Sequence, residues 1–398
     1  MKILMLTPYV PYPPSSGGQI RTLNLLKYLS KKNQITLVAL YKEDGEKKYL
    51  SHLRHYCNKI YLCRRAKRPW QLNNILRAIF SPLPFLIIRN YSEEARKTIT
   101  ELLKNELFDV IHAETFYIMP HIPDTNVPII LVEQTIEYKV YQHFVNSLPF
   151  YLRWLFYLDI IKLKRWERNY WRKANIVTTV SHSDEEVIKE LEPNIRTTIV
   201  PNGAGEEMIT KNLEAKNLKN PYVIFQGNFN WLQNVEAAKY LARFIYPRLI
   251  KIIPNIQVVV SGQNAQKIST LNKEGVLIVD IKSDDFQAVQ SVFNKSTLFI
   301  APIFGPGGTR LKILAAMASG IPVISTKTGV EGLEVENKKH VLIANTADDF
   351  AKVILSILSH KSQYETIRKN AYNLVREKYN WQSIAQTLEM VYETIIKS

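Results

Sequence analysis

Short apolar runs alternate with stretches of helical periodicity along most of the chain. Residues 2–6 and 34–40 are continuous apolar runs, and they flank residues 20–29, where leucine and isoleucine recur at helical spacing. Short apolar runs bounded by turn residues are typical of strands that are buried on both faces of a parallel sheet. The pattern therefore predicts βαβ units and an α/β fold.

The alternation occurs in two successive series, separated by the polar residues 204–221, which are rich in lysine and asparagine. Each series predicts a doubly wound, Rossmann-like domain, and we expect the two domains to face a central cleft. The domains are expected at residues 1–200 and 222–380, joined by a linker at 201–221, with a last helix at 381–398 that packs back on the first domain. The expected strands are residues 2–6, 34–40, 108–112, 127–132, 175–180 and 197–203 in the first series, and 222–227, 257–261, 276–279, 297–300, 323–326 and 340–343 in the second.

The stretch from residue 298 to residue 326 has the pattern of an anion-binding site. An apolar strand leads into the glycine-rich loop 305–308, and Thr309 is the expected N-cap of a helix that Gly320 ends. The free N–H groups and the positive dipole end of such a helix attract anions, and Arg310 and Lys312 add formal charge in its first turn. The alternative is an ordinary βαβ unit with two solvated cations.

Composition and charge narrow the class of partner. The net charge of +16 suits a nucleic acid, an anionic membrane surface or a phosphorylated substrate, but no RNA-binding or DNA-binding motif is present. Cys57 and Cys63 are too few for a zinc site, and we interpret both as structural or incidental. The N-terminus is broken by Pro8 too soon for a signal peptide. Since no apolar run approaches the roughly 20 residues of a spanning helix, we expect a soluble, cytoplasmic protein or a peripheral one.

Short motifs along nearly the whole chain occur in the order and at the spacings of one family. The motifs are Pro14-Ser-Ser-Gly17-Gly18, Pro201-Asn202-Gly203, Gly227-Asn228-Phe-Asn230-Trp-Leu-Gln-Asn234, the stretch from Gly307 to Thr326, and Tyr379-Asn-Trp381. Each motif alone is weak, but their combination is specific. The chain resembles a GT-B glycosyltransferase of the retaining family 4 kind.

The resemblance implies a reaction and a set of ligands. A hexose would pass from a nucleoside-diphosphate sugar, held mainly by the C-terminal domain, to a glycan or lipid-linked acceptor on the N-terminal domain. Retention of configuration is implied, with no metal ion and no other cofactor. Arg310 and Lys312 would act in catalysis by neutralising the departing diphosphate. The implied donor-binding positions are Gly17, Gly18, Asn202, Gly227, Asn228, Asn230, Gly307, Gly308, Thr309 and Ala315.

Ala315 is the main departure from the family pattern. The family carries there the glutamate of an "EAMA" stretch, which binds the donor ribose hydroxyls. An alanine offers no acceptor, so we expect donor binding to be weaker by about 1–3 kcal/mol. The substitution leaves three explanations: engineering, compensation by a neighbouring residue, or lost activity. The second hypothesis is therefore a catalytically silent GT-B protein that binds a nucleotide sugar or a partner.

Acidic residues in the first series are further candidates. Glu114 follows the strand at 108–112 and would face the cleft, so we expect it to act in catalysis by binding acceptor or donor hydroxyls; a structural carboxylate is the alternative. Glu133 and Glu137 follow the next strand, and they are acceptor-side candidates unless they only cap a helix.

Residues 75–89 and 143–173 concentrate aromatic and basic side chains. Helices with aromatic apolar faces and Lys/Arg flanks bind anionic membrane interfaces. We expect contact with the inner face of the cell membrane, which would suit a lipid-linked acceptor. In the alternative, the segment packs into the core through Trp154, Leu158, Ile161 and Trp166.

Overall fold

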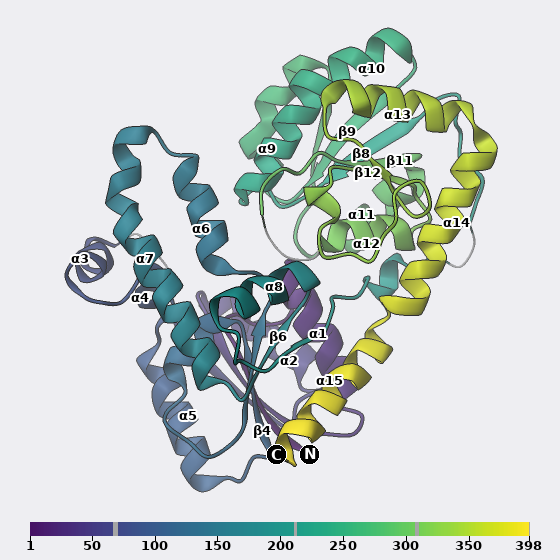
Figure 1. The fold of residues 1–398 in the computed structure, drawn as a ribbon. Coiled ribbons are helices and arrows are strands. Elements are labelled where there is room, and N and C mark those ends of the chain that lie inside the picture. Colours follow the sequence, from purple (N-terminus) through teal and green to yellow (C-terminus); the bar gives the residue numbers. More distant parts are fainter. Residues whose placement is uncertain (67–70, 211–212, 307–309, 398) are drawn as a thin grey trace. The chain divides into compact units, whose positions relative to one another are not determined.

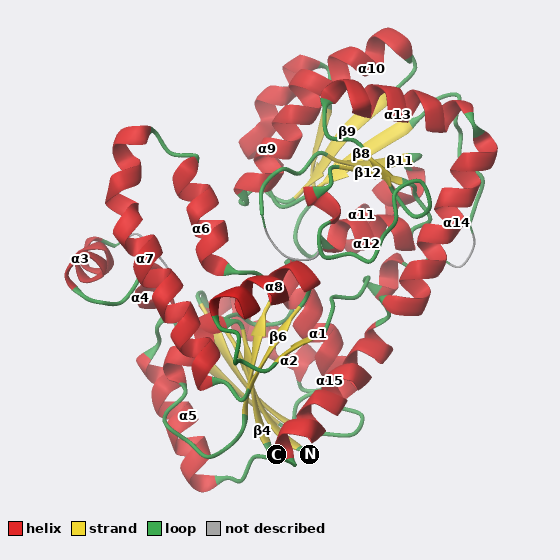
Figure 2. Cartoon of the chain, viewed as in Figure 1, coloured by secondary structure: helices red, strands yellow, loops and turns green. Residues whose placement is uncertain are grey.

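The computed structural model describes residues 1–66, 71–210, 213–306 and 310–397. Its chain forms two compact units, Met1–Pro201 together with the residues from Gln382 onward, and Asn202–Trp381. Figures 1 and 2 show a sheet covered by helices in each unit. The predicted glycine-loop residues Gly307, Gly308 and Thr309 lie outside the described residues.

The first unit is built on a sheet with the strand order β3-β2-β1-β4-β5-β6-β7 among its described residues. All neighbouring strands run parallel; β1 pairs through Met5 with Leu37 of β2 and with His112 of β4. The strands are β1 (Lys2–Thr7), β2 (Gln34–Tyr41), β3 (Lys59–Arg64), β4 (Val110–Glu114), β5 (Ile129–Glu133), β6 (Ile176–Thr179) and β7 (Thr197–Ile199).

Helices cover this sheet, and two of them extend from it as a helical hairpin, α6 and α7 (Figure 1). The helices of the first unit are α1 (Gly17–Leu29), α2 (Leu50–Leu53), α3 (Leu72–Phe80), α4 (Phe85–Asn90), α5 (Glu93–Asn105), α6 (Glu137–Asn146), α7 (Phe150–Lys173), α8 (His182–Leu191) and α15 (Trp381–Ile396). Short 3₁₀ helices span Asp44–Tyr49 and Phe116–His121. Tyr392 of α15 bonds to His112 of β4, and Glu389 accepts from Asn33, so the last helix packs on the first unit.

The second unit has a parallel sheet with the order β10-β9-β8-β11-β12-β13 among the residues described. Its strands are β8 (Tyr222–Gln226), β9 (Gln257–Gly262), β10 (Leu277–Asp280), β11 (Leu298–Ala301), β12 (Val323–Ser325) and β13 (Leu342–Ile343). Its helices are α9 (Leu232–Tyr240), α10 (Tyr246–Ile252), α11 (Phe286–Lys295), α12 (Leu311–Ala318), α13 (Ala347–Ser359) and α14 (Lys361–Lys378), with a π-helical turn at Leu241–Ile245 and 3₁₀ helices at Glu206–Met208, Ala265–Glu274 and Thr328–Val330.

The predicted α/β class and the two Rossmann-like sheets are confirmed. Strands such as β1 are buried over nearly their whole length, here from Ile3 to Thr7, because helices cover both faces of each sheet. The strand β3 was not predicted. It lies at the edge of the sheet, and most of its side chains are not fully buried. Its Cys63 and the nearby Cys57 are free and buried, in agreement with a structural role. Of the helices that the structure describes, none is long and apolar enough to cross a membrane.

Candidate functional site

The sheet of the second unit changes winding direction between β8 and β11. From β8 the chain winds outward through β9 to β10, and from β11 it winds the other way through β12 to β13. In doubly wound folds, ligands bind at the carboxyl ends of the strands beside this switch point. The loop after β8 carries Gly227, Asn228 and Asn230, and the loop after β11 leads to α12. The predicted donor residues of the loop after β8 therefore share one edge of the sheet with the start of α12.

Side-chain amides form a connected cluster at this edge. Asn228 donates through Nδ2 to Gln263 Oε1 at 2.9 Å, and its Oδ1 accepts from Asn264 Nδ2 at 3.0 Å. The same oxygen accepts from the backbone N–H of Asn230 at 3.0 Å. Asn234 Nδ2 donates to the carbonyl of Asn228 at 2.7 Å. The cluster fixes the loop after β8 against the end of β9.

Glycines allow these two strand ends to approach each other. Gly262 at the end of β9 has φ of +135°, and a Cβ there would lie 2.0 Å from the carbonyl oxygen of Gly227. A Cβ on Gly227 would lie 2.8 Å from Cγ of Asn234. Gly227 is therefore required by packing within the second unit. A donor contact at Gly227 stays a prediction.

Lys312 is held at the same edge by neutral groups. Its ammonium donates to Asn234 Oδ1 and lies 4.8 Å from the centroid of the Phe225 ring. Burial, with a smaller contribution from the nearby Arg310 charge, lowers the pKa of Lys312 to about 7. Arg310 Nη2 donates to the carbonyl of Gly305 at 2.7 Å, which draws the guanidinium toward the loop after β11. Two cations thus stand at the start of α12 beside the amide cluster.

Of the two ends of α12, only the C-terminal end agrees with the prediction from the sequence. Arg310, rather than Thr309, occupies the N-cap position. At the other end Gly320 has φ of +64°, its N–H bonds to Met317, and the N–H of Ile321 bonds to Ala316. These are the bonds of a Schellman motif, as glycine at this position predicts. Ala315 lies in this helix, partly buried against the core of the second unit.

Two of the motifs far apart in the sequence contact each other. The N–H of Ala204 bonds to the carbonyl of Tyr379 at 2.9 Å, and a Cβ on Gly203 would lie 2.8 Å from the Trp381 ring. Asn202 is buried beside this turn. The contact explains Gly203 and Trp381 by packing, and a donor contact at Asn202 stays a prediction.

Sequence reasoning missed Gln263 and Asn264. They follow β9, and their place beside Asn228 depends on the order of strands in the sheet. The available signal was their position directly after the predicted strand at 257–261, where doubly wound folds place ligand-contacting loops.

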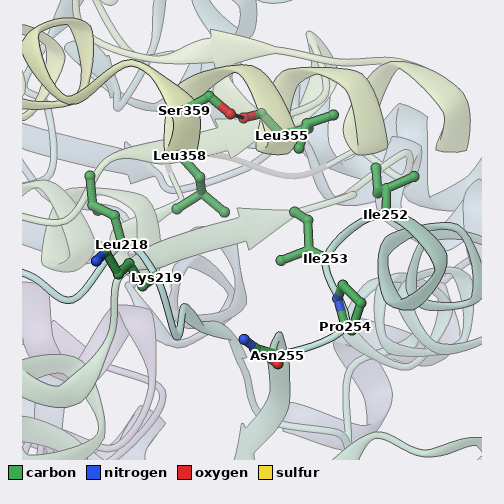
Figure 3. Close-up of a pocket in the computed structure, with 9 residues that line it drawn as sticks. All are labelled: Leu218, Lys219, Ile252, Ile253, Pro254, Asn255, Leu355, Leu358 and Ser359. Atoms are coloured by element: carbon green, nitrogen blue, oxygen red, sulfur yellow. Dashed lines mark hydrogen bonds between the residues drawn. The ribbon is translucent and has the colours of Figure 1, made fainter.

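A pocket of about 230 Å³ elsewhere in the second unit is a poor candidate for the donor site. Figure 3 shows the side chains that line it, among them Leu218, Ile253 and Leu358. The segments 218–219 and 252–255 directly precede β8 and β9, so the pocket lies at the amino ends of these strands. Ligands of doubly wound sheets bind at the opposite, carboxyl edge.

In the first unit, Gly17 and Gly18 form the first turn of α1. Ser16 is the N-cap, and its side chain accepts from the N–H of Gln19. A Cβ on Gly18 would lie 2.5 Å from the Tyr9 hydroxyl, which itself lies 3.1 Å from Thr22 Oγ1. Gly18 thus leaves room for Tyr9. The predicted donor contacts of both glycines stay predictions.

Glu114 is fully buried at the end of β4, in a polar network that joins β4 to α1, to α15 and to the loop after β5. Its Oε1 accepts from Gln134 Nε2 at 2.6 Å and lies 3.4 Å from Arg21 Nε. Its Oε2 lies 2.6 Å from His112 Nε2, while His112 Nδ1 lies 2.7 Å from the Tyr392 hydroxyl. Burial alone would raise the pKa of Glu114, but the His112 hydrogen bond and the Arg21 charge lower it. This arrangement favours the structural alternative for Glu114.

Glu133 and Glu137 belong to a second buried acidic group, which also contains Glu167. Glu167 of α7 accepts from the backbone N–H groups of Glu137 and Tyr138, at 2.7 and 3.1 Å, and so caps α6. Glu133 accepts from Trp171 Nε1 at 2.8 Å. Burial raises the pKa of all three carboxyl groups, to about 7 for Glu137 and about 8 for Glu167, and repulsion from neighbouring carboxylates raises it further at Glu133 and Glu167. The side chain that caps α6 is thus that of Glu167, which the sequence did not single out, rather than that of Glu133 or Glu137. Glu133 is closed off from solvent.

The raised pKa values predict that the first unit loses stability as the pH rises. The unfolded chain releases these protons near pH 4.5, whereas the folded unit keeps them until about pH 7–8. The unfolding temperature of the first unit is therefore expected to fall between pH 5.5 and 8.5, and to fall less in Glu133→Gln. Calorimetric scans test this, with the surface variant Glu106→Gln as control. A stability that rises with pH in this range would contradict the prediction.

Thr115 is a further residue that the sequence did not reveal. Its φ of 72° and ψ of 156° lie in a region that a β-branched residue rarely adopts. It follows β4 beside the switch point of the first sheet, between β1 and β4. Strain of this kind gathers at functional sites, so Thr115 joins the acceptor-side candidates.

Family models match both halves of the chain. The model described as Glycosyltransferase Family 4 matches residues 15–206, and the model described as Glycosyl transferases group 1 matches residues 220–360. A curated relative, the "Uncharacterized 44.6 kDa protein in cps region" of Klebsiella pneumoniae, is 23% identical over 97% of this chain and 98% of its own.

Solved structures share the fold over the full length. Sucrose-phosphate synthase from Thermosynechococcus elongatus has a TM-score of 0.75 at 15% identity, with 100% of this chain and 99% of that chain covered. HepE from Anabaena, in complex with UDP and glucose, has a TM-score of 0.64 at 15% identity, with 99% and 100% covered. With two parallel Rossmann-like sheets and a glycosyltransferase model matched to each half, the chain belongs to the GT-B glycosyltransferases of the family 4 type.

Proposed function

We propose that the chain transfers a hexose from a nucleoside-diphosphate sugar to a glycan or lipid-linked acceptor, with retention of configuration and without a metal ion. The observation that carries the proposal is the pair Arg310 and Lys312 beside the amide cluster of Asn228 and Asn234. A diphosphate is the leaving group of such a transfer, and fixed cations stabilise the charge that develops on it. The complex of HepE with UDP and glucose supports a nucleotide-sugar donor by analogy.

The proposed chemistry assigns few tasks to protein groups. Lys312 and Arg310 hold the phosphate oxygens, and the amides of Asn228 and Asn234 orient the loop that surrounds them. In a retaining transfer of this kind the departing phosphate accepts the proton of the incoming hydroxyl on the same face. No general base from the protein is then needed. The proposed location of the protein is the cytoplasmic side of the cell membrane, where a lipid-linked acceptor would be available.

A ligand panel tests the proposal. We expect a nucleoside diphosphate and its sugar to raise the unfolding temperature of the purified chain, because binding to the folded state alone stabilises it. Transfer should continue in the presence of EDTA, and NMR of the product should show the anomeric configuration of the donor. No thermal shift with UDP, GDP, ADP, TDP or their sugars would overturn the proposal.

A silent nucleotide-sugar-binding protein is the second candidate, and Ala315 is the observation that favours it. The alanine lies in α12, three residues after Lys312, where the family binds the ribose hydroxyls. We expect Ala315→Glu to tighten donor binding about tenfold, since it restores one charged hydrogen bond. Calorimetric titration with the donor found in the panel measures this, and Ala315→Gln is the matched control for charge. Unchanged affinity in both variants would mean that another residue holds the ribose.

A further inference from the structure

Two helices of the first unit carry apolar side chains that the fold leaves exposed. Phe80 of α3 is 83% exposed, and Trp154 and Leu158 of α7 are 70% and 68% exposed. The large apolar side chains that are exposed on the two helices are Leu76, Ile79, Phe80, Phe150, Tyr151, Trp154, Tyr157, Leu158 and Ile161. The core alternative for Trp154, Leu158 and Ile161 is therefore wrong, and only Trp166 packs against the core.

The exposed residues of α7 form one stripe along the helix. Phe150, Trp154, Leu158 and Ile161 recur at spacings of three and four residues, so they share a face. The other face of α7 packs inward through Phe156, Ile160 and Leu163. An apolar stripe on the solvent side of a helix that already has a buried face calls for a partner.

Hydrogen bonds attach α3 and its following loop to α7. Lys162 Nζ donates to the carbonyls of Ala78 and Ser81 at 2.8 and 2.7 Å, and Trp166 Nε1 donates to the carbonyl of Pro82 at 2.9 Å. The N–H of Phe85 bonds to Asp159 Oδ1 at 2.9 Å. Figure 1 shows α3 beside α7. The exposed side chains of the two helices therefore belong to one region, which we call the α3–α7 face.

The charge of this region is positive. The exposed cations on its helices include Arg77, Arg153 and Arg165, and α3 contains no acid. The two acids of α7 are already engaged by the protein, Asp159 by Phe85 and Glu167 by the start of α6. Arg165 continues the stripe of Leu158 and Ile161, where a long side chain can keep its charge in the headgroup layer while the apolar residues insert. Aromatic residues with flanking arginines suit the interface of an anionic bilayer.

We propose that the α3–α7 face docks on an anionic membrane surface, with Phe80, Trp154 and Leu158 inserted at the headgroup boundary. This narrows the membrane contact expected from residues 75–89 and 143–173. In these segments Phe85–Ile88 of α4 and Trp171 of α7 are buried, so they take no part. The inference rests on the proposed function only in that a docked chain would meet a lipid-linked acceptor; docking itself needs neither donor nor acceptor.

Vesicle co-sedimentation of the full chain tests the proposal without any sugar substrate. We expect the chain to pellet with vesicles of phosphatidylcholine and phosphatidylglycerol at low salt, and far less with phosphatidylcholine alone. Two double variants remove apolar side chains from the face, Trp154→Ser/Leu158→Ser and Ile79→Ser/Phe80→Ser. Each should lower the affinity for the anionic vesicles at least about tenfold. Arg77→Gln/Arg165→Gln should weaken binding to the anionic vesicles selectively. The control Leu107→Ser/Met390→Ser removes exposed apolar side chains elsewhere in the first unit and should bind as the unaltered chain does.

Three results would overturn the proposal. The first is equal pelleting of the chain with and without anionic lipid, and the second is an equal loss of vesicle binding in the control variant. The third is a dimer in light scattering that becomes a monomer in the α3–α7 variants, which would identify a second copy of the chain as the partner. Donor-induced thermal shifts measured on the same variants separate this proposal from the proposed function. If the unaltered chain shows the donor-induced thermal shift but does not bind vesicles, the docking proposal is wrong and the proposed function stands.

Discussion

Replacing Lys312 by methionine is expected to lower the rate of sugar transfer by about two to three orders of magnitude, the typical effect of removing one preorganised charge-stabilising group. Lys312 is the cation whose partners, Asn234 and the Phe225 ring, are neutral. Its charge is therefore not compensated before the diphosphate arrives. Methionine keeps an unbranched side chain that is one atom shorter, and it removes the ammonium group. The loss should therefore appear in turnover with the same fold retained.

The same substitution should make the donor-free protein more stable. The pKa of Lys312 is about 7 when folded and near 10.5 when unfolded, so the unfolded chain binds more protons between these values. The loss of folding stability caused by burying the charged Lys312 is fully present below pH 7 and disappears as the pH rises toward 10.5. After allowance for the partial exposure of the side chain, Lys312→Met should raise the free energy of unfolding by on the order of 2 kcal/mol at pH 7. Calorimetric scans should show the unfolding of the second unit shifted upward.

Donor binding should also take up a proton near pH 7.5, because the diphosphate returns Lys312 to its charged form. Titration calorimetry in two buffers of different ionisation enthalpy measures this uptake, which Lys312→Met should abolish. Lys327→Met, which removes an exposed lysine of the second unit, is the control. If the methionine variant of residue 312 transferred sugar at the normal rate, the assignment of the diphosphate site would be wrong.

The features that could be predicted from the sequence are those that local pattern determines. Buried parallel strands are continuous apolar runs, and nearly all of them were found because helices on both faces exclude polar residues. The end of α12 was predicted because a left-handed residue after a helix favours glycine, and Gly320 has φ of +64°. Arg310 and Lys312 were selected because the start of a helix after a glycine-rich loop attracts anions, and their contact with the donor stays a prediction.

The features that were missed depend on contacts between distant segments. Gln263 meets Asn228 because β9 is the neighbour of β8, which only the strand order determines. Glu167 caps a helix that begins 30 residues earlier. On α7 the periodicity predicted an apolar face, but it could not tell that Phe156 and Ile160 pack inward while Trp154 and Leu158 face solvent.

Glu114 shows how tertiary structure changes the interpretation of a candidate. Its position directly after a predicted strand, where it would face the cleft, predicted a substrate contact. The structure instead places Arg21, His112 and Gln134 around the carboxylate, and Arg21 Nη1 continues to the carbonyls of Val200 and Pro201 at 3.1 and 3.0 Å. The network joins α1, β4 and α15 to the end of the first unit, and its members come from segments as far as 280 residues apart.

Glu114→Ala is accordingly expected to destabilise the first unit by about 3–5 kcal/mol, because it leaves the fully buried Arg21 without its carboxylate. For a unit of this size the unfolding temperature should fall by roughly 10 °C. Glu106→Ala, which breaks the exposed ion pair with Lys59, is the matched control and should cost at most about 1 kcal/mol. Glu114→Gln keeps the shape and part of the hydrogen bonding, and it separates the two roles of the residue. If Glu114 binds substrate hydroxyls, this variant loses transfer at unchanged stability; if it is structural, it loses stability first, and the molecules that remain folded transfer sugar at the normal rate.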